Sequence, residues 1–216
     1  MLARGIAMCG GTHIALGDYA RGEELAHEAR ELARRIGFPP PFVSGGIDLL
    51  TIFARSRNPG RADALMDEVA RAVVAASGWH GWLWRLRLSQ ARAELALARG
   101  DWQPAIVAAT EGIADSEARS RPKYVALGLL TRAQARKAAD DVLQAIGDAS
   151  RALAIARTLG DPAVLLRALN VQIDLDGSDA LAGEARGCSE RILSHLDEGG
   201  LRERFLASEL LPATRM

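Results

Sequence analysis

Apolar and polar residues alternate along the chain with the period of an α-helix, and the pattern is interrupted about every twenty residues. Within 141–160, Val142, Ile146 and Leu153 fall on one side of such a helix, whereas Asp148 falls on the other. The same spacing recurs between the other interruptions. The pattern therefore predicts a succession of amphipathic helices, each with one apolar face to bury.

The interruptions form two alternating series of turn residues. One series is Gly37, Gly78, Ser120, Gly160 and Gly199-Gly200, and the other is Gly17, Asn58, Gly100, Ala139 and Gly177. Members of each series lie about forty residues apart, which predicts a repeating unit of two helices. Two Pro-containing pairs, Asn58-Pro59 and Asp161-Pro162, are predicted to be an N-cap followed by the first helical residue.

These boundaries predict one all-α domain over residues 1–216. We expect five helix pairs and a capping helix, at about 3–37, 41–77, 80–120, 122–159, 162–196 and 200–211. Alanine and leucine make up about a third of the chain, and the residues that favour strands are sparse. A single pair cannot bury its apolar face, so the pairs are expected to stack into one continuous core.

The turn LALARGDWQPAI resembles that of a tetratricopeptide repeat. A small residue, a Gly-Asp pair, an aromatic and a second small residue are matched by Ala93, Gly100, Asp101, Trp102 and Ala105. The first pair matches with Gly10, Gly17, Asp18, Tyr19 and Gly22. The fourth matches with Ala133, Asp140, Asp141 and Ala145, although Val142 replaces the aromatic. The second and fifth pairs match only in the forty-residue period and in the turn residues that separate their helices.

This resemblance implies a right-handed α-α superhelix. The period exceeds the usual ~34 residues and is similar to that of the sensor regions of large bacterial signal-transduction ATPases, but no G-x-x-x-x-G-K-[ST] loop is present. We therefore expect a non-catalytic module that binds a protein or peptide, as the sensor or scaffold part of a regulator. The resemblance places its binding face on the first helices, at Arg87, Gln90, Glu94, Gln134, Lys137, Arg167 and Asp174.

The segment WHGWLWRLRL contains Trp79, Trp82 and Trp84, three of the four tryptophans. Tryptophan is enriched at binding hot spots, so these side chains could anchor a peptide or a second copy of the chain. A second hypothesis is a small-molecule-responsive regulatory domain with a pocket near Trp82 and Trp84. The interpretation we favour is structural, in which the indoles fill space between the second and third helix pairs.

The remaining candidate chemistry is sparse. The four histidines are scattered and form no HExxH pair, so no metal or other cofactor is expected. The acidic segment DLDGSD lacks the calcium-loop spacing and is better explained as a turn, capped by Ser178 or Asp179. Gly10-Gly11 and Gly45-Gly46 are not phosphate loops, and close helix packing explains them better.

The charges balance, with 27 basic and 27 acidic residues, so direct nucleic-acid binding is not expected. A local basic cluster is more simply a solvated helix surface; it comprises Arg119, Arg121, Lys123, Arg132, Arg136 and Lys137. Apolar runs are too short for a membrane span. Cys9 and Cys188 fit free thiols of a cytoplasmic protein, and self-association through the N-terminal helix would give a homodimer.

Overall fold

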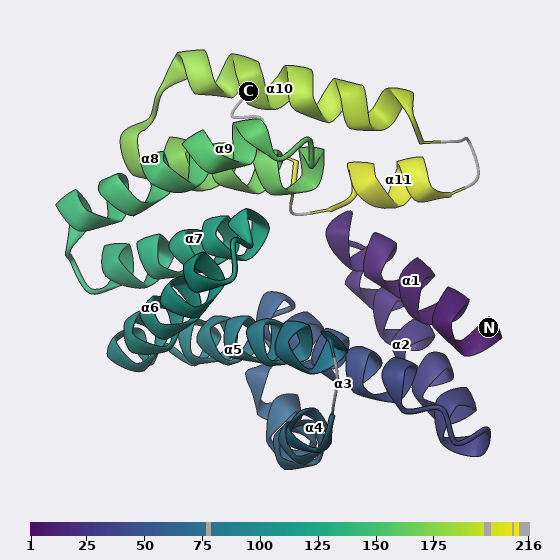
Figure 1. Ribbon diagram of the computed structural model, residues 1–216. Coiled ribbons are helices and arrows are strands. Elements are labelled where there is room, and N and C mark those ends of the chain that lie inside the picture. The colour runs from purple at the N-terminus through teal and green to yellow at the C-terminus, as the bar shows by residue number, and fades with distance from the viewer. Residues whose placement is uncertain (77–78, 197–199, 209, 212–216) are drawn as a thin grey trace. The chain divides into compact units, whose positions relative to one another are not determined.

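The computed structural model describes residues 1–76, 79–196, 200–208 and 210–211, and in these residues it contains helices and no strands (Figure 1). The helices are α1 (Leu2–Ala15), α2 (Tyr19–Arg35), α3 (Pro39–Arg55), η1 (Pro59–Ala62, a 3-10 helix), α4 (Asp63–Ala75), α5 (Trp79–Arg99), α6 (Trp102–Ala118), α7 (Pro122–Ala138), α8 (Val142–Thr158), α9 (Pro162–Asp176), α10 (Asp179–Ser194) and α11 (Leu201–Leu206). Two helices fall largely within each predicted pair. The all-α class and the array of helix hairpins are confirmed.

Most turns between these helices contain a residue in the left-handed region of backbone space. The glycines among them are Gly17, Gly37, Gly100, Gly160, Gly177 and Gly200. Ser120 has a φ of 53°, which is the left-handed backbone that a glycine usually adopts, and this agrees with its predicted place in the series of turn residues. At the other two turns the left-handed residue is Arg57 or Asp140, each one position from the predicted Asn58 and Ala139. Without a glycine to mark them, these turns could be placed only approximately. Gly78 and Gly199 lie outside the described residues.

Helix starts agree with the predicted caps in part. The Asp161 carboxylate accepts from the backbone N–H of Val164 at 3.1 Å, and Pro162 follows as the first helical residue. Ser178 accepts from the N–H of Leu181 at 3.5 Å, which confirms the capped acidic turn. Asn58, in contrast, precedes only η1 and makes no side-chain cap bond, while α4 begins at Asp63.

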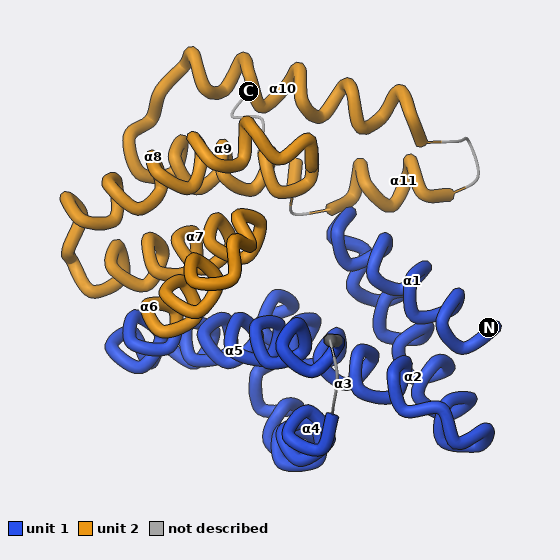
Figure 2. The backbone as a smooth tube through the Cα atoms, viewed as in Figure 1, with its two compact units in different colours: residues 1–108 blue, residues 109–216 orange. Residues whose placement is uncertain are grey.

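The chain forms two compact units, residues 1–108 and 109–216 (Figure 2). In unit 1, α3 is the central helix and packs against α1, α2, α4 and α5. Its residues Ile47, Leu50 and Phe53 are at most 4% exposed. In unit 2, α7, α8, α9 and α10 pack in sequence order. Each unit therefore has a core of its own.

The predicted capping helix is shorter than expected, because α11 ends at Leu206. Its Phe205 side chain is fully buried, and Leu210 beyond it is 7% exposed. The Asn170 side chain on α9 donates to the Leu210 carbonyl at 2.7 Å. The C-terminal segment thus buries two apolar side chains and is joined to α9 by a hydrogen bond, although only part of it is helical.

Glycines inside helices mark close approaches between helices. A Cβ added at Gly22 would lie 2.8 Å from the Ile14 side chain, and one at Gly10 would lie 3.3 Å from Leu25. At Gly45 it would lie 3.1 Å from the Ala26 carbonyl. Real Cβ atoms do not reach the shortest of these distances, so helix packing explains these glycines as predicted. Gly11 differs, since nothing lies within 4 Å of its Cβ position.

Candidate functional site

Arg87, Gln90 and Glu94 lie together on α5 and face α3. Arg87 donates to the Asp48 carboxylate at 2.5 Å. The Arg55 guanidinium donates to both oxygens of Glu94 at 2.7 and 2.8 Å, and Gln90 donates to Glu94 at 2.9 Å. The three predicted residues thus form a row of polar contacts, here called the ladder, with Asp48 and Arg55 on α3. The sequence analysis did not identify Asp48 or Arg55.

Burial controls the electrostatics of this ladder. Burial raises the pKa of Asp48, and the positive charges of Arg87 and Arg55 oppose that rise. Burial lowers the pKa of Arg55, but the Glu94 carboxylate outweighs it, and the net pKa is raised. The side chains of Arg55 and Glu94 are only 16% and 11% exposed. These charges therefore bind the hairpins to each other and present few groups to solvent.

The remaining residues of the predicted face belong to unit 2. Lys137 on α7 pairs with the Asp174 carboxylate on α9 at 2.7 Å, and both side chains are largely exposed. Gln134 is exposed on α7, and Arg167 is partly exposed on α9. Two of the four therefore touch each other. That all seven residues of the predicted face share one surface stays a prediction.

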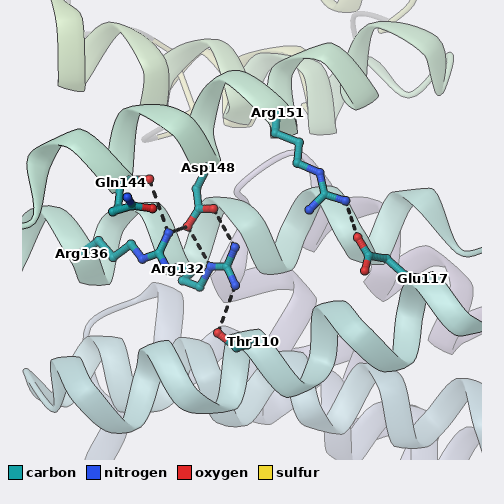
Figure 3. A network of polar contacts seen from close by, with 7 residues as sticks. All are labelled: Thr110, Glu117, Arg132, Arg136, Gln144, Asp148 and Arg151. Atoms are coloured by element: carbon teal, nitrogen blue, oxygen red, sulfur yellow. Dashed lines mark hydrogen bonds and ion pairs between the residues drawn. The ribbon is translucent and has the colours of Figure 1, made fainter.

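Asp148 lies at the centre of a second polar network in unit 2 (Figure 3). It accepts from Arg132 at 2.7 and 2.8 Å and from Arg136 at 2.7 Å, and its side chain is 8% exposed. The hydrogen bond to Asp148 raises the pKa of Arg132. The prediction of Asp148 on the polar outer side is wrong, because the two arginines draw it between α7 and α8.

The predicted basic cluster is largely neutralised within the chain. Besides the arginines bound to Asp148, Arg119 pairs with Asp115 at 2.9 Å and Lys123 pairs with Asp161 at 2.6 Å. Lys137 has Asp174 as its partner. Because these basic side chains are paired with acidic side chains of the same chain, the pairs agree with the interpretation of the cluster as a helix surface.

The tryptophans differ in their surroundings. Trp84 is 7% exposed, belongs to the core of unit 1 and stacks on the His80 ring, with the ring centres 5.4 Å apart. Its burial favours the structural interpretation. Trp82 is partly exposed, so its role as an anchor stays a prediction. The side chain of Trp79 lies outside the described residues.

A groove of about 540 Å³ opens in unit 1 between α2, α3 and α4. Its apolar lining residues are Leu49, Phe53 and Leu65, here called the floor. The exposed arginines of its lining, Arg34 and Arg61, are here called the rim, and the Arg61 guanidinium lies over the Phe53 ring at 4.3 Å. Neither Trp82 nor Trp84 is among its lining residues. This volume lies in the range of small-ligand and side-chain pockets.

The groove arises from the irregular second hairpin. Residues 56–62, including η1, connect α3 to α4, whereas only residues 139–141 connect α7 to α8. As a result α4 packs much less extensively against α3 than α8 does against α7. The longer connection thus moves α4 aside and opens the groove over α3. The sequence signal for this was weak, because the second pair matched the repeat pattern only in its period and turn residues, and so did the fifth pair.

Other candidate chemistry is limited. No group of three or more His, Cys, Asp or Glu side chains in the described part of the chain is placed to hold a metal ion. Cys9 is exposed and Cys188 is buried, and both are free thiols. Burial raises the pKa of Cys188. Among the described residues, no helix combines the length and apolar character needed to cross a bilayer.

Comparison with models of known protein families found no match, and a search of curated proteins found none either.

Proposed function

We propose that this chain is a non-catalytic interaction module that binds a segment of a partner protein. The observation that carries the proposal is the groove of about 540 Å³ in unit 1, which combines an apolar floor with a charged rim. Recognition surfaces for peptides combine apolar pockets with polar groups that fix orientation. The groove lies on an array of rigid helices, which can hold such a surface in place.

We further propose that the hairpins form a right-handed superhelix of five tetratricopeptide-type repeats. Support comes from ion pairs between residues about one repeat apart. Arg55 and Glu94 are 39 residues apart and join α3 to α5, and Lys123 and Asp161 are 38 apart and lie at the starts of α7 and α9. Equivalent helices thus contact each other within each unit. In this proposal the chain is the sensor or scaffold part of a cytoplasmic signalling regulator.

Peptide display tests the module and locates its surface. A random peptide library would be selected against the chain and against Ala64→Tyr, which fills the groove from an exposed position on α4. The matched control is Ala180→Tyr, because Ala180 is also exposed and is also the second residue of its helix. We expect enriched peptides that bind the unmodified chain and the control but not Ala64→Tyr.

Other outcomes would change the proposal in defined ways. Peptides that bind Ala64→Tyr normally would remove the groove and favour the predicted face at Arg87. Charge reversal at Arg87 itself is a poor test, since a new carboxylate would oppose the buried Asp48 and disturb the fold. Failure to enrich any peptide would refute the module.

A further inference from the structure

Arg30 is a buried cation in the wall of the groove, and the surrounding fold fixes its position. The residue is 6% exposed. It donates to the backbone carbonyl of Phe42 at 3.1 Å and lies over the Phe42 ring at 4.3 Å. Gly45 and Gly46 leave the space that its side chain fills, since a Cβ at either position would press against it. The guanidinium is therefore held by backbone and ring contacts that do not depend on its ion-pair partner.

The partner of Arg30 is a far less constrained group. Arg30 donates to Glu68, whose side chain on α4 is 42% exposed, whereas that of Arg30 is 7% exposed. Glu68 belongs to the helix that packs loosely against α3. The fixed member of this pair is thus the cation, and the member open to solvent is the carboxylate.

Arg30 lines the groove and Glu68 does not, so a carboxylate that enters the groove would offer Arg30 the kind of ion pair that Glu68 now supplies. The guanidinium has already lost its water on folding, so exchange of one carboxylate for another buries no additional cation. Its planar fork matches the geometry of a carboxylate. Arg34 and Arg61 lie nearby at the rim, with side chains 59% and 46% exposed. The Arg34–Glu31 pair is exposed on both sides and contributes little. Arg61 is held more firmly, because it donates to both oxygens of Glu23 and lies over the Phe53 ring.

The apolar floor of the groove indicates that the ligand carries an apolar side chain as well as a carboxylate. Leu49, Phe53 and Leu65 line it beside Arg30. We propose that the groove binds an acidic, apolar peptide segment, in which a Glu or Asp carboxylate displaces Glu68 from Arg30 and a neighbouring large apolar side chain covers this floor. The inference rests on the proposed function and names the partner of the same site.

The test uses two rhodamine-labelled, acetylated and amidated peptides, Glu-Leu-Glu-Phe-Leu and its isostere Gln-Leu-Gln-Phe-Leu. Fluorescence anisotropy with the full chain is expected to give at least about tenfold tighter binding of the Glu peptide. Glu68→Gln removes the internal competitor and is expected to tighten that binding about two- to fivefold. Glu117→Gln is the matched control, because it breaks the Glu117–Arg151 pair in unit 2 and leaves the groove unchanged.

A loss-of-affinity variant completes the design. Arg34→Gln removes an exposed cation from the rim, so the fold is retained, which far-UV circular dichroism checks. It is expected to weaken binding of the Glu peptide severalfold. Equal affinity for the two peptides, or no difference between Glu68→Gln and Glu117→Gln, would overturn the inference.

Two further results would distinguish an acidic, apolar peptide from other ligands of the groove. Glutarate that competes as well as the whole peptide would show that the apolar floor is unused, and would reassign the groove to small dicarboxylates. Selected peptides that lack acidic residues, yet lose binding in Ala64→Tyr, would overturn the acidic partner while the interaction module survives.

Discussion

Replacing Gly46 by alanine tests how closely the buried arginine is fitted into unit 1. A Cβ at this position would press against the Arg30 guanidinium and would lie 2.6 Å from Val69 Cγ2. Val69 is 1% exposed, so neither neighbour has free space into which to retreat. The methyl group must therefore push Arg30 from its position or shift α3 against α4.

The magnitude follows from three opposing contributions. Overpacking a core costs about 1–3 kcal/mol, and alanine instead of glycine inside a helix recovers about 0.5–1 kcal/mol. Breaking a buried ion pair costs ~3–5 kcal/mol. Displacement of Arg30 adds only part of this cost, because its partner Glu68 is 42% exposed. We expect Gly46→Ala to lower the free energy of unfolding by about 2–3 kcal/mol.

Urea unfolding followed by circular dichroism measures this change, with Gly11→Ala as the control. Gly11 lies inside α1 with nothing within 4 Å of its Cβ position, so alanine there should stabilise by about 0.5–1 kcal/mol. In an Arg30→Ala background, the cost of Gly46→Ala should fall by more than ~1 kcal/mol. The reasoning is refuted if Gly46→Ala stabilises like Gly11→Ala, or costs the same in both backgrounds.

Three further predictions concern unit 2. Ser120→Gly should raise the stability by about 0.5–1 kcal/mol in thermal unfolding, because it relieves a left-handed backbone at φ 53°; a lower Tm would contradict this. Asp148→Ala should cost about 3 kcal/mol in urea unfolding, since it leaves two half-buried arginines together, whereas the exposed Asp115→Ala should cost under ~1 kcal/mol; equal costs would refute the network. Burial raises the pKa of Asp161, but hydrogen bonds from Lys123 and the backbone outweigh it and lower the pKa. Its contribution to stability is therefore complete above the unfolded pKa of ~3.9 and is lost as the pH falls through the folded value. Urea midpoints at about pH 2–6 should show a smaller acid loss for Asp161→Asn than for the parent chain.

Helix boundaries could be predicted because each turn carries a local chemical marker. Glycine at position 37 or 160 has a left-handed backbone, and Asp161 supplies a cap with Pro162 behind it. Markers of this kind act within a few residues, so a single sequence is enough to find them. Where the turn residue is Asp140, no glycine reveals it, and the prediction was wrong by one position.

The groove could not be predicted, because it depends on where α4 lies relative to α2. Arg30 is one of many charges in an Arg- and Glu-rich helix, and nothing local distinguishes it as buried. Its burial follows from Gly45 and Gly46 on the next helix and from the ring of Phe42. Asp148 was misplaced for a similar reason, since helical periodicity takes no account of arginines on a neighbouring helix. A search for opposite charges one period apart would have found Asp48 with Arg87.

The ladder between α3 and α5 also determines which hairpins can be neighbours. Along α3 an acid at Asp48 precedes a base at Arg55, and along α5 the base Arg87 precedes the acid Glu94. Both helices use the same spacing with opposite order, so each charge meets its complement. A tandem copy of the α3 hairpin would instead oppose acid to acid and base to base. Hairpins of this chain are therefore not interchangeable parts, and duplicating or shuffling them would require rewriting the charges at each new junction.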